Sequence, residues 1–214
     1  MSNFASSFNE ISELLQKGKA KDIVVAVEKA LSDGAAPADI LEKGLLSGMS
    51  IIGGKFQNGE IFVPEVLIAA RAMSKASEAL KTALNEAGVQ PVGQAIICTV
   101  KGDLHDIGKN LVRMMIEGKG IEVIDLGIDC DSDKIIDAVQ KSNAKVVCLS
   151  ALLTTTMLMQ KEIIDALKAA GLRDKVKVMV GGAPVTQSFA DEIGADAYTP
   201  DAASAADVCR TFYD

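Results

Sequence analysis

Five short apolar stretches after residue 88 constrain the fold of this 214-residue chain more than any other feature. A stretch with helical periodicity follows each of them. Segments this uniformly apolar are typical of strands buried on both faces of a parallel sheet. The alternation predicts an α/β domain over 92–214, with a five-stranded parallel sheet of the flavodoxin-like (Rossmann-like) class. The predicted strands are 95–100, 121–127, 144–151, 175–182 and 195–200, and the predicted helices lie near 107–118, 131–142, 155–170, 185–193 and 201–212.

The region before Gly88 has helical periodicity throughout. The longest helix is predicted over 64–86, where Pro64 suits the first turn and Gly88 follows the end. Four helices joined by short connections predict an all-α four-helix bundle over 1–88, followed by a linker near 88–94. The other predicted helices are 7–17, 20–32 and 37–57.

Composition and charge argue against several classes of protein. The net charge is -7 and only 4% of residues are aromatic, so we expect no nucleic-acid partner. The N-terminus does not resemble a secretory signal and no apolar run is long enough to cross a bilayer, so we expect a cytoplasmic protein without a membrane partner. Four scattered cysteines without a CxxC pair are interpreted as buried, inert thiols, and they make a structural zinc site unfavourable.

Polar motifs follow three of the predicted strands, and a parallel sheet brings them to one edge. Each has a structural alternative: a turn with Asp103 or Asp106 capping the next helix, a hydroxyl N-cap cluster, and a tight glycine turn. Their convergence favours a binding site, because the edge also collects the only histidine. The motifs are Asp103-x-His105-x-x-Gly108, Ser150-x-Leu152-x-Thr154-x-Thr156 and Gly181-Gly182.

Asp103 and His105 suit one chemical role. A metal-bound imidazole usually donates its second ring N–H to a carboxylate, which fixes the tautomer. One histidine cannot hold a bare transition-metal ion alone. It can add one axial ligand to a metal that a macrocycle already holds.

The three motifs, in this order, resemble the signature of cobalamin-binding domains, DxHxxG, SxL and GG. In those domains the cofactor is bound base-off, with histidine on cobalt. From about residue 5 to its end, the chain resembles the methyl-carrying corrinoid proteins of anaerobic methyltransferase systems. The stretch NGEIFVPEVLIAARAM, 58–73, is similar to the helix entry of their N-terminal bundle.

The resemblance assigns roles to individual residues. His105 is the expected lower axial ligand of cobalt, Asp103 its hydrogen-bond partner, and Thr156 an extension of that relay. Asp106 is expected beside the cofactor, with an exposed or capping acid as the alternative. Other residues expected at the cofactor are Ile107, Gly108, Ser150, Leu152, Thr154, Gly181, Gly182, Tyr198 and Asp201. Possible cap residues over the methyl face are Phe62, Val63 and Val66, for which packing inside the bundle is the alternative.

The resemblance further implies a corrinoid (cobalamin) carrier that is not a catalyst alone. It would accept a methyl group on Co(I) from a substrate-specific methyltransferase and deliver it to a second methyltransferase acting on tetrahydrofolate or a thiol coenzyme. A reductive activase is an expected partner. The donor stays open among methoxylated aromatics, methylamines, methanol and quaternary amines. The bundle is expected to cover the methyl face, with the 88–94 linker as its hinge.

Three other interpretations compete with the carrier. A cobalamin-responsive regulator usually adds a DNA-binding module, for which this chain leaves no residues. A small subunit of a cobalamin-dependent mutase needs a large catalytic barrel beside it. A flavodoxin or response-regulator receiver is disfavoured because Asp125 and Asp129 match its acidic cluster poorly and His105 would have no role.

Overall fold

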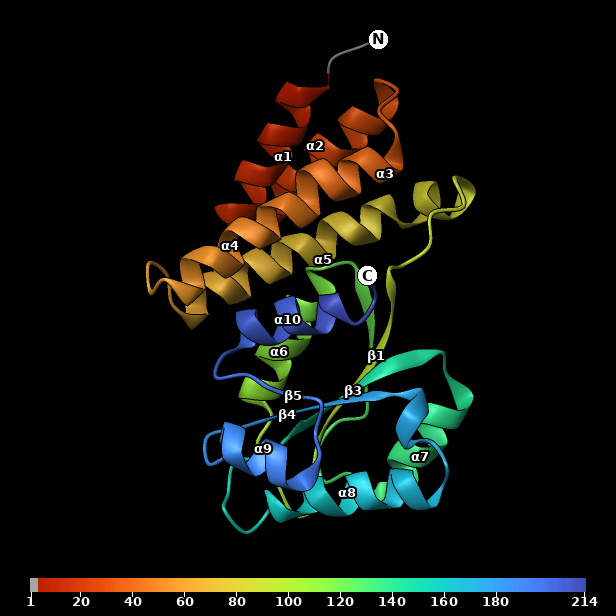
Figure 1. The fold of residues 1–214 in the computed structure, drawn as a ribbon. Coiled ribbons are helices and arrows are strands. Elements are labelled where there is room, and N and C mark those ends of the chain that lie inside the picture. Colours follow the sequence, from red (N-terminus) through yellow and green to blue (C-terminus); the bar gives the residue numbers. More distant parts are fainter. Residues whose placement is uncertain (1–3) are drawn as a thin grey trace. The chain divides into compact units, whose positions relative to one another are not determined.

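The computed structural model describes residues 4–214 and divides into two compact units, one ending at Gln90 and the other beginning at Pro91. The described part of the first unit is helical. No helix among the described residues is both long and apolar enough to cross a membrane. The helices of this unit (Figure 1) are α1 (Ala5–Gln16), α2 (Ala20–Ser32), α3 (Pro37–Asp39), the π-helix η1 (Ile40–Leu46), α4 (Ser47–Gln57) and α5 (Val63–Glu86).

The stretch 37–57, predicted as one helix, contains the π-helical turns of η1 in its middle. Two glycines there allow α1 to pack closely. A Cβ on Gly44 would lie 2.9 Å from Cγ2 of Ile11, and a Cβ on Gly48 would lie 3.2 Å from the carbonyl oxygen of Ser12. Side chains at these two positions would push α1 away from η1 and α4.

The second unit is a five-stranded parallel sheet with helices on both faces, as predicted. The strand order is β2-β1-β3-β4-β5, the flavodoxin-like order. Its elements are β1 (Gly93–Thr99), α6 (Ile107–Glu117), β2 (Ile121–Asp125), α7 (Ser132–Lys141), β3 (Ala144–Ser150), α8 (Leu158–Ala169), the 3-10 helix η2 (Arg173–Lys175), β4 (Lys177–Gly181), α9 (Gln187–Ile193), β5 (Ala197–Tyr198) and α10 (Ala202–Thr211).

Two predicted boundaries in this unit are wrong. The last strand has only two residues instead of the stretch 195–200. Helix α8 begins at Leu158 rather than near 155. The delay arises because the preceding residues form a turn, in which the N–H of Thr156 and that of Met157 both donate to the carbonyl of Leu153.

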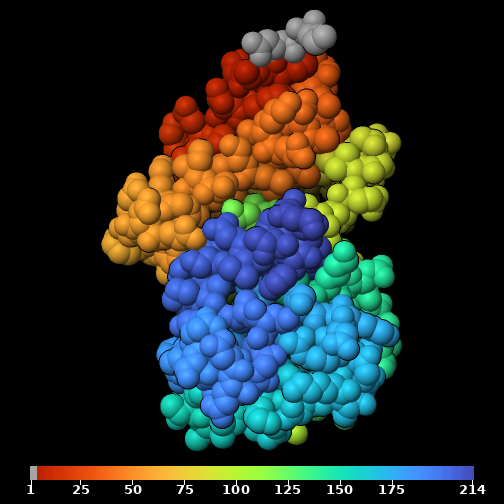
Figure 2. Space-filling model, viewed as in Figure 1, coloured from red at the N-terminus to blue at the C-terminus, as the bar shows by residue number. Residues whose placement is uncertain are grey.

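Helices cover both faces of the sheet. Helices α7, α8 and α9 lie on one face, and α6 and α10 on the other (Figure 1). In the space-filling view, cyan and blue residues form most of this side of the second unit (Figure 2). Central strand residues such as Ile96, Val147 and Val178 are completely buried. All four cysteines are free and buried, as predicted.

The register of the sheet brings three motifs to its carboxyl edge. Thr99, the last residue of β1, pairs with Ser150, the last residue of β3. Ser150 pairs in turn with Gly181 at the end of β4. The loops that carry the predicted site residues therefore start from adjacent positions, where ligands bind in open α/β sheets.

A buried ion pair holds α6 against the end of β2. The ammonium of Lys109, whose side chain is 3% exposed, lies 2.6 Å from both carboxylate oxygens of Asp125, whose side chain is 29% exposed. Burial raises the pKa of Asp125, but the hydrogen bonds from Lys109 and the Gly127 N–H, with the charges of Lys109 and Arg113, lower it more. The carboxyl therefore remains ionised below its usual pKa range. The pair therefore secures the helix that follows the histidine motif.

We expect Asp125→Asn to lower the free energy of unfolding by about 2 to 3 kcal/mol. The variant leaves the buried Lys109 charge without its anion, and the cost falls below that of a fully buried pair because Asp125 is partly exposed. Chemical denaturation at neutral pH measures it. Since the folded-state pKa of Asp125 is lowered, the loss is complete above about pH 5 and disappears as the pH falls below about 4. Asp165→Asn removes an exposed pair with Lys161 and is the control, with no measurable change expected. Equal losses in the two variants would contradict this account.

Candidate functional site

The Asp103 carboxylate is the centre of the candidate site. Its side chain is completely buried, and both of its oxygens are fully hydrogen-bonded. Oδ1 accepts the backbone N–H of His105 at 3.1 Å and lies 2.9 Å from Nδ1 of the same residue. Oδ2 accepts the N–H of Leu152 and the hydroxyl of Thr156, each at 2.7 Å. One carboxylate thus joins the loop after β1 to the turn after β3.

These contacts determine which nitrogen of His105 can bind a metal. Burial raises the pKa of Asp103, but the hydrogen bonds from Leu152, Thr156 and His105 lower it far more, so the pKa lies well below its usual range. An ionised carboxylate can only accept hydrogen bonds, so Nδ1 of His105 must carry the proton. The Nε2 lone pair is then available on a side chain that is 56% exposed.

The surroundings of His105 are apolar and unusually exposed. Leu104 is 68% exposed, Ile107 77% and Leu152 40%. Large apolar side chains grouped at a loop edge indicate a surface that a ligand covers. This rim of Leu104, Ile107 and Leu152 fits the face of a large, mostly apolar ring.

Gly108 and Gly181 leave open space beside the rim, whereas Gly182 does not. A Cβ on Gly108 or on Gly181 would meet no heavy atom within 4 Å. A Cβ on Gly182 would lie 1.7 Å from the carbonyl oxygen of Ala151, and its φ is +126°. Glycine is therefore required here by the protein's own backbone, and a role for Gly182 at the cofactor stays a prediction.

The structure brings most predicted site residues to the same edge. Ser150 ends β3, Thr154 is exposed in the following turn, and both hydroxyls lack a partner in the described part of the chain. Neither residue caps α8, whose N-terminus has no side-chain cap, so the alternative of an N-cap cluster is wrong. Asp106 precedes α6 without capping it by its side chain, and its Oδ2 instead accepts the amide of Asn110.

Other predicted site residues have roles within the protein. Tyr198 packs against the core cluster beneath α7, α8 and α9. The Asp201 carboxylate caps α10 by accepting the N–H groups of Ala203 and Ser204. A place for either residue beside the cofactor stays a prediction.

The three predicted cap residues of the helical unit differ in exposure. Val66 is completely buried, so its prediction as a residue of the methyl face is wrong and the packing alternative holds. Phe62 is 67% exposed, and its N–H donates to Glu65 at the start of α5. Val63, the first residue of α5, is partly buried.

Gln160 is a further residue of this edge that the sequence motifs do not reveal. Its side-chain amide is fully buried and donates to the carbonyls of Leu149 and Gly181, at 3.0 and 3.1 Å, which binds the ends of β3 and β4 together. Its Oε1 has no partner among the described residues. A glutamine in an otherwise apolar helix position was the available signal, since buried amides normally need partners.

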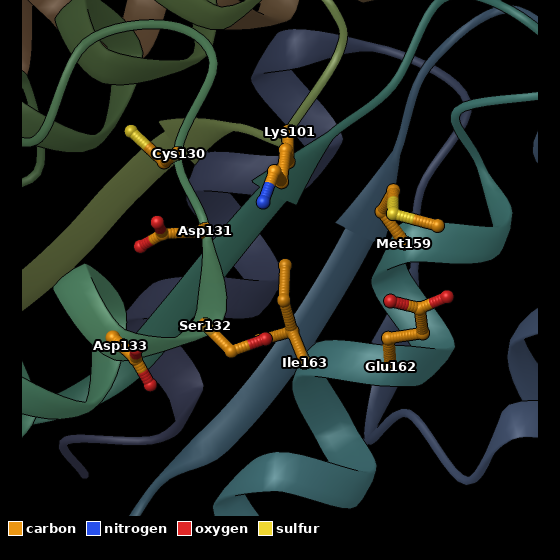
Figure 3. Close-up of a pocket in the computed structure, with 8 residues that line it drawn as sticks. All are labelled: Lys101, Cys130, Asp131, Ser132, Asp133, Met159, Glu162 and Ile163. Carbon is orange, nitrogen blue, oxygen red and sulfur yellow. The ribbon is translucent and has the colours of Figure 1, made fainter.

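A separate pocket of about 230 Å³ lies beside the loop that follows β1 (Figure 3). Lys101 comes from the loop after β1, Asp131 and Ser132 from the start of α7, and Met159 from α8. It is a polar cavity distinct from the apolar rim around His105. No group of three or more His, Cys, Asp or Glu suited to a metal occurs within residues 4–214, so a metal at His105 must bring its other ligands with it.

Comparison with known proteins identifies the family. Residues 93–207 match the B12 binding domain, and residues 7–81 match a second family that is also described as a B12 binding domain. The dimethylamine corrinoid protein of Methanosarcina barkeri is 44% identical over 197 residues, which cover 92% of each chain. The chain belongs to the methyl-carrying corrinoid proteins.

This corrinoid protein has further relatives over nearly its whole length. The monomethylamine corrinoid protein 2 of Methanosarcina mazei is 41% identical, with 94% of each chain covered. The methanol:cobalamin methyltransferase complex MtaBC from Methanosarcina barkeri contains a chain with a TM-score of 0.87 and 30% identity, covering 97% of this chain and 80% of that one. A cobalamin-binding protein from Desulfitobacterium hafniense DCB-2 matches with a TM-score of 0.80 and 34% identity, covering 96% and 98%. These matches confirm the predicted family and fold class.

Proposed function

We propose that this corrinoid protein carries a methyl group between two methyltransferases on a cobalamin bound base-off, with His105 as the lower axial ligand. The observation that supports this ligand best is the contact of His105 with Asp103. The buried carboxylate holds the proton on Nδ1 and leaves the Nε2 lone pair exposed at the rim. This is the arrangement in which a histidine binds a metal from one side.

The residues around His105 fit the rest of such a cofactor. Leu104, Ile107 and Leu152 offer apolar contact to a corrin ring. The open positions at Gly108 and Gly181 allow the nucleotide tail to approach the backbone closely. The unpaired hydroxyls of Ser150 and Thr154 are suited to its polar groups.

The corrinoid and the residues around His105 would have separate roles in methyl transfer. When bound, the corrinoid supplies cobalt that is strongly nucleophilic towards methyl groups as Co(I). The chain's own part is to hold the imidazole in one tautomer, to keep Asp103 ionised, and to set the strength of ligation through the Asp103–Thr156 hydrogen bond. Such partners commonly change metal affinity about 10- to 100-fold.

The methyl donor that we propose is a methylamine, presented by a substrate-specific methyltransferase. The support is that relatives at 41–44% identity are named dimethylamine and monomethylamine corrinoid proteins. A second methyltransferase, acting on a thiol coenzyme or tetrahydrofolate, would accept the methyl group. A reductive activase would return oxidised cobalt to the reactive state.

Reconstitution tests the proposal. Purified protein is mixed with hydroxocobalamin and passed through a desalting column, and its absorption spectrum is recorded. We expect one tightly held corrinoid per chain, with the absorption of a form in which a histidine has replaced the lower base. The loaded, reduced protein is then incubated with a methylamine methyltransferase and labelled mono- or dimethylamine, and label should appear on the corrinoid. A corrinoid that separates completely on the column would refute the proposal.

A further inference from the structure

The loop after β2, residues 126–131, supports the backbone of the loop after β1. We call residues 126–131 the supporting loop and residues 100–106 the histidine loop. The N–H of Gly102 donates to Oδ1 of Asp129 at 2.7 Å, and the N–H of Asp129 donates to the carbonyl of Asp103 at 3.1 Å. Asp129 therefore holds the backbone on both sides of the peptide bond between Gly102 and Asp103. Figure 3 shows the two loops next to each other, with Lys101 in one and Cys130 and Asp131 in the other.

Asp129 has an unusual backbone conformation. Its φ is +52°, and it is the only non-glycine residue with a positive φ within residues 4–214. Aspartate and asparagine tolerate this region better than most residues, but glycine fits it without strain. Glycine would remove the carboxylate that binds Gly102, so the side-chain contact explains an aspartate here.

The supporting loop is itself well anchored. The ammonium of Lys134 donates to the carbonyl of Leu126 at 2.7 Å. The N–H of Cys130 donates to the carbonyl of Thr99, and the N–H of Thr99 donates to the carbonyl of Gly127, both at 3.0 Å. The buried hydroxyl of Thr99 also donates to the carbonyl of His105 at 2.8 Å. The end of β1 thus joins the supporting loop to the histidine loop.

We propose that Asp129 is a positioning residue for His105. Asp129 fixes the backbone positions of Gly102 and Asp103. Through them it determines how well the imidazole of His105 reaches cobalt. This inference rests on the proposed function, because it assumes that His105 is the axial ligand. Leu104 and Ile107 both face solvent, so the histidine loop is held mainly by hydrogen bonds, among them those of Asp129 and Thr99.

Three variants separate the contact from the backbone effect. Asp129→Gly keeps the positive φ and removes the acceptor of the Gly102 N–H. Asp129→Asn keeps an oxygen acceptor at that place. Asp131→Ala is the matched control in the same loop, because the Asp131 carboxylate caps α7 by accepting the N–H of Lys134 and makes no hydrogen bond to the histidine loop among the described residues.

The measurement is the fraction of histidine-ligated corrinoid. Each protein is labelled with ¹⁵N-histidine, loaded with cobalamin and reduced to Co(II), and the nitrogen splitting of its electron paramagnetic resonance spectrum is recorded. We expect Asp129→Gly to shift the ligation equilibrium about tenfold towards the form without histidine. Asp129→Asn should restore most of it. Asp131→Ala should lower the melting temperature through the lost cap, with ligation unchanged.

Other outcomes would overturn the inference in distinguishable ways. Wild-type ligation in Asp129→Gly would refute it while leaving His105 as the ligand. An equal loss in Asp129→Gly and Asp131→Ala would show a general loosening of the loop and refute the specific role. If Asp129→Asn behaves like the glycine variant, the Gly102 hydrogen bond is not the cause. A wild-type spectrum without a histidine nitrogen would refute the ligand assignment itself, and this inference with it.

Discussion

A His105→Ala variant is expected to lose nitrogen ligation from the protein while keeping its fold. The side chain is 56% exposed, so its removal leaves no buried cavity. Asp103 keeps its contacts with Leu152 and Thr156. The absorption spectrum of the cobalamin-loaded variant should shift to that of a form without an imidazole ligand, and corrinoid affinity should fall about 10- to 1000-fold. That range corresponds to losing about 1.4 to 4 kcal/mol of binding free energy.

Free imidazole provides the control for this variant. The exposed position of the ring means that added imidazole can reach the space left by the alanine. It should restore the wild-type spectrum in a concentration-dependent manner. A variant whose spectrum equals that of the wild type, with or without imidazole, would exclude His105 as the ligand.

Alanine substitutions at Gly181 and Gly182 are expected to impair different properties, corrinoid affinity at Gly181 and stability at Gly182. Gly182→Ala puts a methyl group 1.7 Å from the carbonyl oxygen of Ala151 and forces alanine to adopt a φ of +126°. The free energy of unfolding should fall by about 3 kcal/mol or more. Gly181→Ala meets nothing within 4 Å and should leave the stability of the cofactor-free protein unchanged.

Corrinoid affinity, unlike stability, should be lowered by the substitution at Gly181. If the cofactor's tail passes over Gly181, the added methyl group should weaken corrinoid affinity about 10- to 100-fold. Thermal unfolding of the cofactor-free proteins and titration with hydroxocobalamin measure the two effects separately. Normal affinity in Gly181→Ala would place the tail elsewhere, and normal stability in Gly182→Ala would contradict the close approach to Ala151.

The sequence predicts the fold well because its signals are local. Apolar strands alternate with amphipathic helices, and the parallel order brings the ends of β1, β3 and β4 together. The Asp103–His105 contact is equally predictable, since the residues are two positions apart. The Thr156 contact follows once the two loops are known to share one edge.

The remaining features depend on contacts that a sequence pattern does not encode. The Lys109–Asp125 ion pair and the hydrogen bonds of Asp129 join segments that no local motif connects. Gly182 and Gly181 look alike in the sequence, and only the path of the Ala151 backbone separates them. Val66 has the same apolar character as Phe62, yet its place on the inner face of α5 buries it.

The exposed apolar rim of Leu104, Ile107 and Leu152 links the folding of this protein to its cofactor. A ligand that covers the rim binds the folded chain and not the unfolded one, so it shifts the folding equilibrium by mass action. At a free corrinoid concentration 100 times the dissociation constant, the added stability is about 2.7 kcal/mol. Supply of the vitamin would then govern both how much of this carrier is active and how much survives degradation.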